Sequence, residues 1–146
     1  MTTDNAKGHA LNATTVLLVL DDRSSLEYLQ NILQFIDCDV HLPEAPDELK
    51  RLVQRFNDRS VSVFLSGQLP DQDRSAYLSA INACNPRPAL IQVQEKPGDE
   101  MLVSGDVLGT LSMPCQYDAI TSLLHKAQVY EESQRHGEAP RRPLEL

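Results

Sequence analysis

A short, uninterrupted apolar run at residues 16–20 ends directly in two adjacent acids, Asp21 and Asp22. A run of this length with no polar face is typical of a central strand in a parallel sheet, covered by helices on both sides. Comparable apolar runs recur at residues 61–65 and 89–93, and stretches of helical spacing lie between them. This alternation predicts a parallel sheet built from repeated βα units.

The spacing of apolar, proline and glycine residues predicts five strand–helix units. The compact arrangement for a chain of this size is the α/β flavodoxin-like doubly wound fold, with five parallel strands in the order 2-1-3-4-5. We expect strands at residues 16–20, 39–42, 61–65, 89–93 and 107–111, and helices at residues 24–37, 46–56, 73–84, 99–104 and 118–133.

The chain is organised as one domain between two polar ends. We expect a flexible N-terminus at residues 1–14, a folded domain at 15–130 and the start of a linker at 131–146, where proline and arginine recur. No apolar run approaches the ~20 residues that cross a bilayer. The N-terminus has neither the basic nor the apolar region of a signal peptide. These features predict a cytoplasmic protein with no membrane partner.

The charge balance excludes some partners. The chain carries 13 Lys and Arg against 21 Asp and Glu, a formal net charge of −8. Binding to nucleic acids or anionic membranes depends first on basic side chains, so we expect this domain not to bind DNA by itself. Cys38, Cys84 and Cys115 are scattered. They lack the spacing of a metal site or a disulfide framework, and we interpret them as buried thiols.

In the expected fold, the functional crevice lies at the carboxyl ends of strands 1 and 3. Asp21 and Asp22 follow the first strand, and Ser66 ends the third. Pro70 stands four positions after Ser66. Across residues 15–130 this pattern resembles the receiver domain of response regulators, in which a phospho-accepting Asp precedes a proline by four positions.

The resemblance implies a site with five parts. Two acids and the acceptor Asp bind Mg²⁺, a Ser or Thr ends strand 4, and a Lys before a proline ends strand 5. Asp21 and Asp22 supply the acid pair, but Ser66 stands in the acceptor position. A neutral alcohol without an evident base is a poor nucleophile, and two carboxylates hold Mg²⁺ weakly.

The remaining two parts of the site are also altered. The strand-4 position falls on Val93, or on its neighbours Gln92 or Gln94, and none of these is Ser or Thr. Met113, followed by Pro114, occupies the lysine position and supplies no charge. Phosphoryl transfer needs a nucleophile, a metal and a cation. We therefore predict a degenerate receiver that is not an enzyme and carries no cofactor.

The acid pair has two interpretations. Asp21 or Asp22 can cap the following helix by accepting hydrogen bonds from its first-turn amides, or the pair can retain a metal. Without an acceptor Asp, the helix cap is the favoured interpretation. The helix itself is expected to begin at Ser24, where the residues up to Glu27 have the spacing of a capping box.

Four segments narrow the resemblance. Residues 16–22, 29–35, 108–114 and 123–130 resemble the receiver region of flagellar master regulators of the FleQ/FlrA type. These are sigma-54-dependent transcription activators. The resemblance implies an atypical N-terminal receiver, a central AAA+ ATPase, a C-terminal helix-turn-helix domain and a response to cyclic di-GMP. The sequence contains no Walker A loop, so we expect ATP hydrolysis and DNA binding to belong to the remainder of such a protein.

The resemblance also suggests partners. We expect a homodimer, with Ala127 and Tyr130 of the last helix contributing to a dimer or coupling seam. The second expected partner is the AAA+ domain of the same protein. Arg135, Arg141 and Arg142 are candidate contacts for cyclic di-GMP in the linker, because arginine forks suit phosphate.

Two alternatives compete with this regulatory role. The first is a receiver in a two-component phosphorelay that is phosphorylated on a non-standard acceptor such as Asp21 or Asp71. The second is a small flavodoxin-like enzyme or cofactor binder. Against the second stands the absence of a glycine-rich phosphate loop after the first strand.

Overall fold

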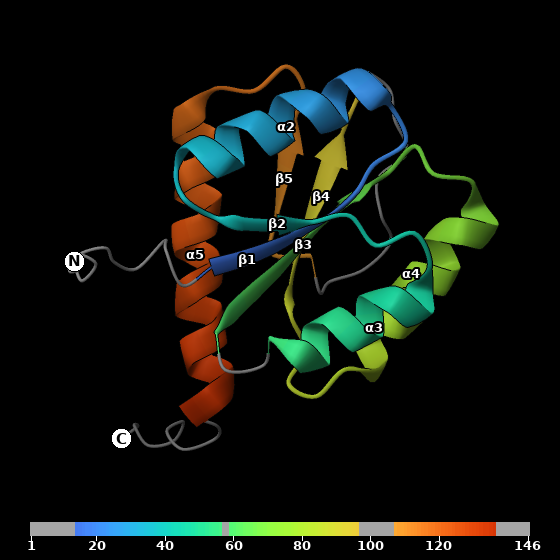
Figure 1. Cartoon of the computed structure of the whole chain (residues 1–146), viewed down its shortest axis with the longest axis vertical. Coiled ribbons are helices and arrows are strands. Elements are labelled where there is room, and N and C mark those ends of the chain that lie inside the picture. Colours follow the sequence, from blue (N-terminus) through green and yellow to red (C-terminus); the bar gives the residue numbers. More distant parts are fainter. Residues whose placement is uncertain (1–13, 57–58, 97–106, 137–146) are drawn as a thin grey trace.

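The computed structural model describes residues 14–56, 59–96 and 107–136. Five parallel strands form one sheet in the order β2-β1-β3-β4-β5 (Figure 1). Helices cover both faces of this sheet. The elements in chain order are β1 (Thr14–Val19), α2 (Arg23–Phe35), β2 (Asp39–His41), α3 (Pro46–Arg55), β3 (Ser60–Ser66), α4 (Asp71–Ala83), β4 (Ala89–Gln94), β5 (Gly109–Ser112) and α5 (Tyr117–His136).

The predicted fold class and strand order are confirmed, and most boundaries differ by one or two residues. The fifth strand lies slightly later than expected, at Gly109–Ser112. The helix expected at residues 99–104 lies outside the described residues. α5 continues to His136, three residues beyond the expected helix end at 133, and so runs into the segment expected as the start of the linker. None of the described helices has the length and apolarity needed to cross a membrane.

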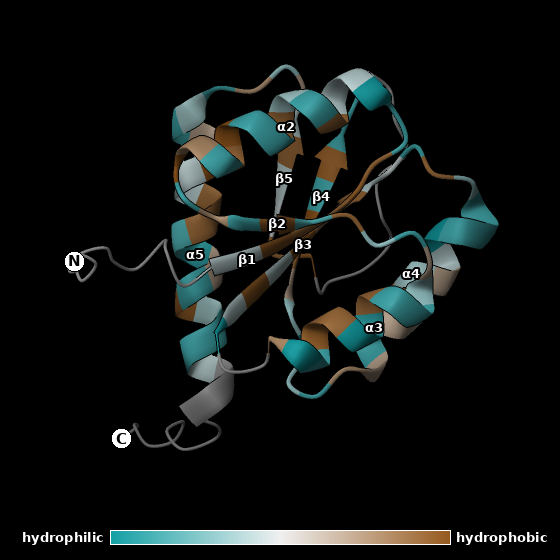
Figure 2. Ribbon diagram, in the orientation of Figure 1, coloured by the Kyte–Doolittle hydropathy of each residue, from teal (hydrophilic) through white to brown (hydrophobic). Residues whose placement is uncertain are grey.

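Alternate side chains of the strands point to two separate cores, because successive residues of a strand face opposite sides. Leu17 and Leu65 belong to the core under α3 and α4. Leu18 and Phe64 belong to the core under α2 and α5. The apolar residues concentrate on the strands and on the inner sides of the helices (Figure 2). Apolar burial on both faces explains why residues 16–20, most of which lie in β1, form an uninterrupted apolar run.

Parallel pairing brings the carboxyl ends of the strands to one edge of the sheet. Ser66 at the end of β3 pairs with Val93 of β4. Val93 in turn pairs with Leu111 of β5, two positions before Met113. The loop that carries Asp21 and Asp22 follows β1 at the same edge. The strands therefore bring the candidate site residues together.

All three cysteines are buried free thiols, as predicted. Burial, together with the charges of Asp37 and Asp39, raises the pKa of Cys38 from 9.0 to about 12. Burial also raises the pKa of Cys84 and of Cys115. Thiols in such environments are unreactive, because the thiolate is the nucleophile.

We expect iodoacetamide to alkylate Cys38 of the folded protein at mildly alkaline pH about three orders of magnitude more slowly than a thiol with the ordinary pKa. In denaturant all three cysteines should react. Since the Cys38 pKa is raised on folding, its contribution to stability is complete below pH 9.0 and falls as the pH rises toward about 12. Mass spectrometry of timed samples measures the rates. Rapid loss of one thiol equivalent from folded protein would contradict this burial.

Candidate functional site

Asp22 caps the first helix. Its carboxylate Oδ2 accepts a hydrogen bond from the Ser25 backbone N–H at 3.0 Å and another from the Ser25 hydroxyl at 3.3 Å. The backbone of Asp22 is extended, as an N-cap requires, and α2 begins at Arg23. The cap interpretation is therefore confirmed for Asp22. The expected capping box beginning at Ser24 is wrong by two residues, because Asp22 supplies the capping oxygen.

Removal of this cap has a defined expected effect. Asp22→Ala should lower the free energy of unfolding by about 1 kcal/mol, because the Ser25 amide loses its acceptor. Asp22→Asn, which keeps an acceptor oxygen, should cost less. Urea denaturation followed by circular dichroism measures both values. Equal losses in the two variants would show that charge, rather than capping, is what Asp22 contributes.

Glu95 joins the end of β4 to the loop that carries the acid pair. Its Oε2 accepts the backbone N–H of Asp21 and its Oε1 accepts that of Asp22, both at 2.9 Å. The side chain is buried, with 7% of its residue surface exposed. Hydrogen bonds to a charged acceptor are stronger than neutral ones, so this carboxylate fixes the β1–α2 loop.

Ser66 is fully buried at the end of β3. Its hydroxyl oxygen accepts the backbone N–H of Gln68 at 3.0 Å, a local bond that stabilises the turn after the strand. The neighbouring Gly67 N–H donates to the Val93 carbonyl at 3.0 Å. The residue in the acceptor position thus organises its own loop and offers no carboxylate.

Val93 and Met113 give the other two altered positions an apolar character. Val93 is level with Ser66 in the sheet and is fully buried in the core under α2 and α5. Met113 is partly buried and packs against the same core. Its backbone N–H donates to the Gln94 carbonyl at 2.9 Å, which places it beside the end of β4. Met113 thus places a thioether at the position where the resemblance to receiver domains implies a lysine.

The residues do not fit the Mg²⁺ site that the receiver fold implies. Mg²⁺ requires several oxygen ligands in near-octahedral geometry. The Asp22 carboxylate is turned toward the first turn of α2, and both oxygens of Glu95 are engaged by loop amides. Across the described part of the chain, no three His, Cys, Asp or Glu residues are grouped so as to hold a metal ion. Asp21, Asp22 and Ser66 therefore do not assemble the family's metal centre.

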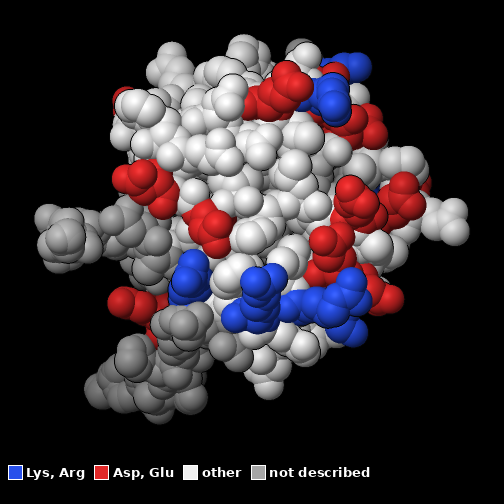
Figure 3. Space-filling view, viewed as in Figure 1, with Lys and Arg blue, Asp and Glu red and all other residues white. Residues whose placement is uncertain are grey.

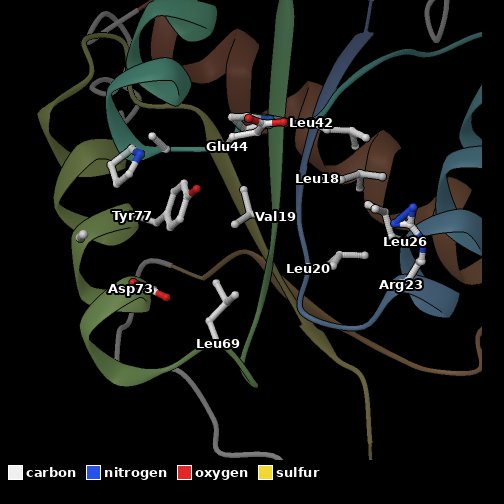
Figure 4. Close-up of a pocket in the computed structure, with 14 residues that line it drawn as sticks. Leu18, Val19, Leu20, Arg23, Leu26, Leu42, Glu44, Leu69, Asp73 and Tyr77 are labelled. Atoms are coloured by element: carbon white, nitrogen blue, oxygen red, sulfur yellow. The ribbon is translucent and has the colours of Figure 1, made fainter.

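A hollow of about 610 Å³ opens at the end of β1, between α2, α4 and the β2–α3 connection (Figure 4). Leucine, alanine and proline form most of its lining. Arg23 is the one cationic residue in the lining of this hollow. Its Nε lies 3.8 Å from Oε2 of Glu27. Phosphate-bearing cofactors need several converging donors, so the lining of this hollow does not favour the cofactor-binder alternative.

The last helix places its candidate residues differently from the sequence expectation. Ala127 is fully buried inside the domain and has no exposed surface in the described structure. Tyr130 is half-buried, and the neighbouring Val129 is exposed, at 59%. The expectation that Ala127 contributes to a dimer or coupling seam is corrected, because its side chain is fully buried within the domain itself. Arg135 lies within α5, and Arg141 and Arg142 lie outside the described residues.

Solved structures share this fold. The response regulator StyR superposes with a TM-score of 0.66 at 17% identity, over 85% of this chain and 63% of that one. A CheY-like receiver domain from Methanospirillum hungatei JF-1 superposes with a TM-score of 0.58 at 19% identity, over 85% of this chain and 98% of that one. A sensor protein from Polaromonas sp. JS666 superposes with a TM-score of 0.63 at 20% identity, over 81% of this chain and 98% of that one. The fold is that of a response-regulator receiver domain.

A comparison with protein-family models identifies the family of this chain. Residues 15–129 match the family model described as flagellar regulatory protein FleQ. The chain therefore belongs to the FleQ family of flagellar regulatory proteins, in agreement with the resemblance noted in the sequence. A search of curated proteins finds no match.

Proposed function

We propose that this domain is a phosphorylation-independent pseudo-receiver, the regulatory domain of a cytoplasmic, sigma-54-dependent flagellar transcription activator that responds to cyclic di-GMP. The observation that carries the proposal is the end of β3. There Ser66 replaces the acceptor carboxylate, and its hydroxyl accepts the amide of its own turn.

The surrounding chemistry supports the same conclusion. Transfer of a phosphoryl group to a side chain requires a nucleophile, a metal to neutralise charge and a cation near the transferring oxygens. Ser66 is a buried alcohol, Asp22 is committed to the helix cap, and Met113 carries no charge. The loop after β1 is held by Glu95, which favours one fixed conformation.

Acetyl phosphate with Mg²⁺ is expected to leave the intact mass of the protein unchanged, because no competent acceptor is assembled at the site. A phosphorylation-competent receiver treated in parallel serves as the control. A mass increase of one phosphoryl group would overturn the proposal in favour of a non-standard acceptor. Asp21→Asn and Asp71→Asn would then show which carboxylate is modified, since both residues are exposed.

The domain is further proposed to dimerise and to set the geometry of an AAA+ domain that follows it. α5 supports this proposal, because it runs along the whole side of the sheet and extends past the ends of β1 and β3 (Figure 1). A helix that leaves the domain in a fixed direction transmits its orientation to whatever follows. Cyclic di-GMP is proposed to act at the junction beyond α5, not within the receiver fold.

A constitutive dimer is the expected result of sedimentation equilibrium over a range of protein concentrations. Since the proposed module has no covalent switch, the dissociation constant should not change when acetyl phosphate and Mg²⁺ are added. Dimerisation that appears only with the phosphodonor would contradict the proposed function.

A further inference from the structure

The hollow at the end of β1 lies where β2 stops short of its neighbour. β2 pairs with β1 only as far as Leu17, which is level with His41. β1 continues to Val19, whereas the chain after His41 leaves the sheet and leads into α3 through residues 42–45. The end of β1 therefore has no neighbouring strand on this side, and residues 18–20 line the hollow instead.

Leucine side chains from several elements surround this hollow (Figure 4). Leu20, Leu26 and Leu69 are half-buried, and Leu42 at the rim is 38% exposed. Water finds few hydrogen-bond partners against such a lining, so replacing that water with apolar side chains is favourable. The volume of about 610 Å³ lies within the range of about 300–1,000 Å³ that is typical of binding sites.

Two carboxylates give the hollow a negative charge. Glu44 and Asp73 belong to its lining, and no cation that the structure describes forms an ion pair with either of them. Arg23 also belongs to the lining, but it is 82% exposed and its charge is offset by Glu27. In the view of Figure 3, acidic groups gather on the side where α4 and the N-terminal end of α3 lie.

Tyr77 experiences this negative charge inside the hollow. Its hydroxyl and the Asp73 carboxylate both point into the space beside β1 (Figure 4). Burial raises the pKa of Tyr77, and the carboxylates of Asp73, Glu48 and Glu44 raise it further. Carboxylates that disfavour a negative charge on this hydroxyl favour a positive charge brought into the same space.

The dipole of α4 explains only part of this arrangement. Asp71 and Asp73 both lie in the first turn of α4, where acids stabilise a helix. Asp71 is paired with Arg74, whose Nη2 lies 2.6 Å from its Oδ1, and it does not line the hollow. The dipole accounts equally for both acids, but it does not account for the direction of Asp73 into an apolar hollow. A carboxylate beside apolar surface is complemented by a cation on an apolar stem.

We propose that this hollow docks a segment of a partner protein in which lysine or arginine stands beside leucine-like residues. The apolar side chains of that segment fill the space over Leu20, Leu26 and Leu69. Its cation lies near Glu44 and Asp73, because a long basic side chain packs its stem on apolar surface while its charged end reaches a carboxylate. Acidic segments are repelled by the same two carboxylates. This docking depends neither on the loss of phosphorylation nor on dimerisation.

Three synthetic peptides test the chemistry of the occupant by NMR titration of the isotope-labelled chain at physiological ionic strength. The peptides share their leucine positions and carry lysine, glutamine or glutamate at the polar positions. The lysine peptide should shift the amides of lining residues such as Leu20, Leu42 and Ala76. Its dissociation constant should be at least about tenfold lower than that of the glutamate peptide. Equal binding of the glutamate peptide, no binding of the lysine peptide, or shifts confined to other surfaces would each overturn the proposal.

Paired substitutions locate the binding of the lysine peptide. Asp73→Asn should raise its dissociation constant about threefold or more, whereas Asp71→Asn, in the same turn of α4 but outside the lining, should leave it within about twofold. Leu42→Ala should also weaken binding about threefold or more, and Val129→Ala on α5, where the residue is 59% exposed, is its matched control. Equal losses within each pair would show general attraction to an acidic chain and would overturn the site. Circular dichroism spectra establish that every variant is folded.

Discussion

Phe64→Ala is expected to lower the free energy of unfolding by about 3–5 kcal/mol. Phe64 lies in β3, the central strand, and is the largest side chain among the fully buried residues. The truncation removes apolar contacts and leaves a cavity in the core under α2 and α5. A domain with a total stability of about 5–15 kcal/mol would lose much of it.

Chemical denaturation in urea measures this loss, and Phe35→Ala provides the matched control. Phe35 is 79% exposed at the end of α2, so the same chemical change should alter stability by about 0.5 kcal/mol or less. Comparable losses for the two variants would show that β3 does not occupy the centre of the core.

Glu95→Ala is expected to cost about 2–3 kcal/mol, because the amides of Asp21 and Asp22 both lose a charged acceptor. Glu95→Gln keeps one acceptor oxygen and should lose roughly half as much. The effect should be local as well as global. Hydrogen exchange at the Asp21 and Asp22 amides should accelerate in both variants, and more strongly in Glu95→Ala.

Glu27→Ala is the control for this second prediction. Its side chain is 65% exposed on α2 and lies 3.8 Å from Arg23, so its removal should change stability by less than about 1 kcal/mol. If the amide hydrogen exchange rates of Asp21 and Asp22 in Glu95→Ala equal those of the unmodified protein, the role assigned to Glu95 is refuted, whatever the change in global stability.

The sheet could be predicted because each strand is recognised from a short stretch of neighbouring residues. Apolar runs such as residues 61–65 correspond closely to buried strands, and the alternation with helices leaves few arrangements. The altered site positions could also be placed, since Ser66 and Met113 follow directly from where β3 and β5 end. The helix cap by Asp22 could be predicted as well, because its hydrogen-bond partner Ser25 is only three residues away in the sequence.

The features that could not be predicted depend on contacts between distant segments. Glu95 is 74 residues from Asp21, and it reaches from the end of β4, across the position of β3, to the loop after β1. A local signal did exist, because Glu95 directly follows a buried strand at the edge where the site assembles. Ala127 was misplaced because helical spacing identifies an apolar face without identifying what covers it.

The buried carboxylate of Glu95 bears on how long a signal from this domain lasts. A receiver that is switched by an acyl phosphate keeps a covalent record of its stimulus until that bond is hydrolysed. Here the loop after β1 is held by a side chain of the same chain, which is present at all times and cannot be removed by a phosphatase. With the proposed function, the domain carries no memory of past signals. The duration of its output then follows the lifetimes of noncovalent complexes alone.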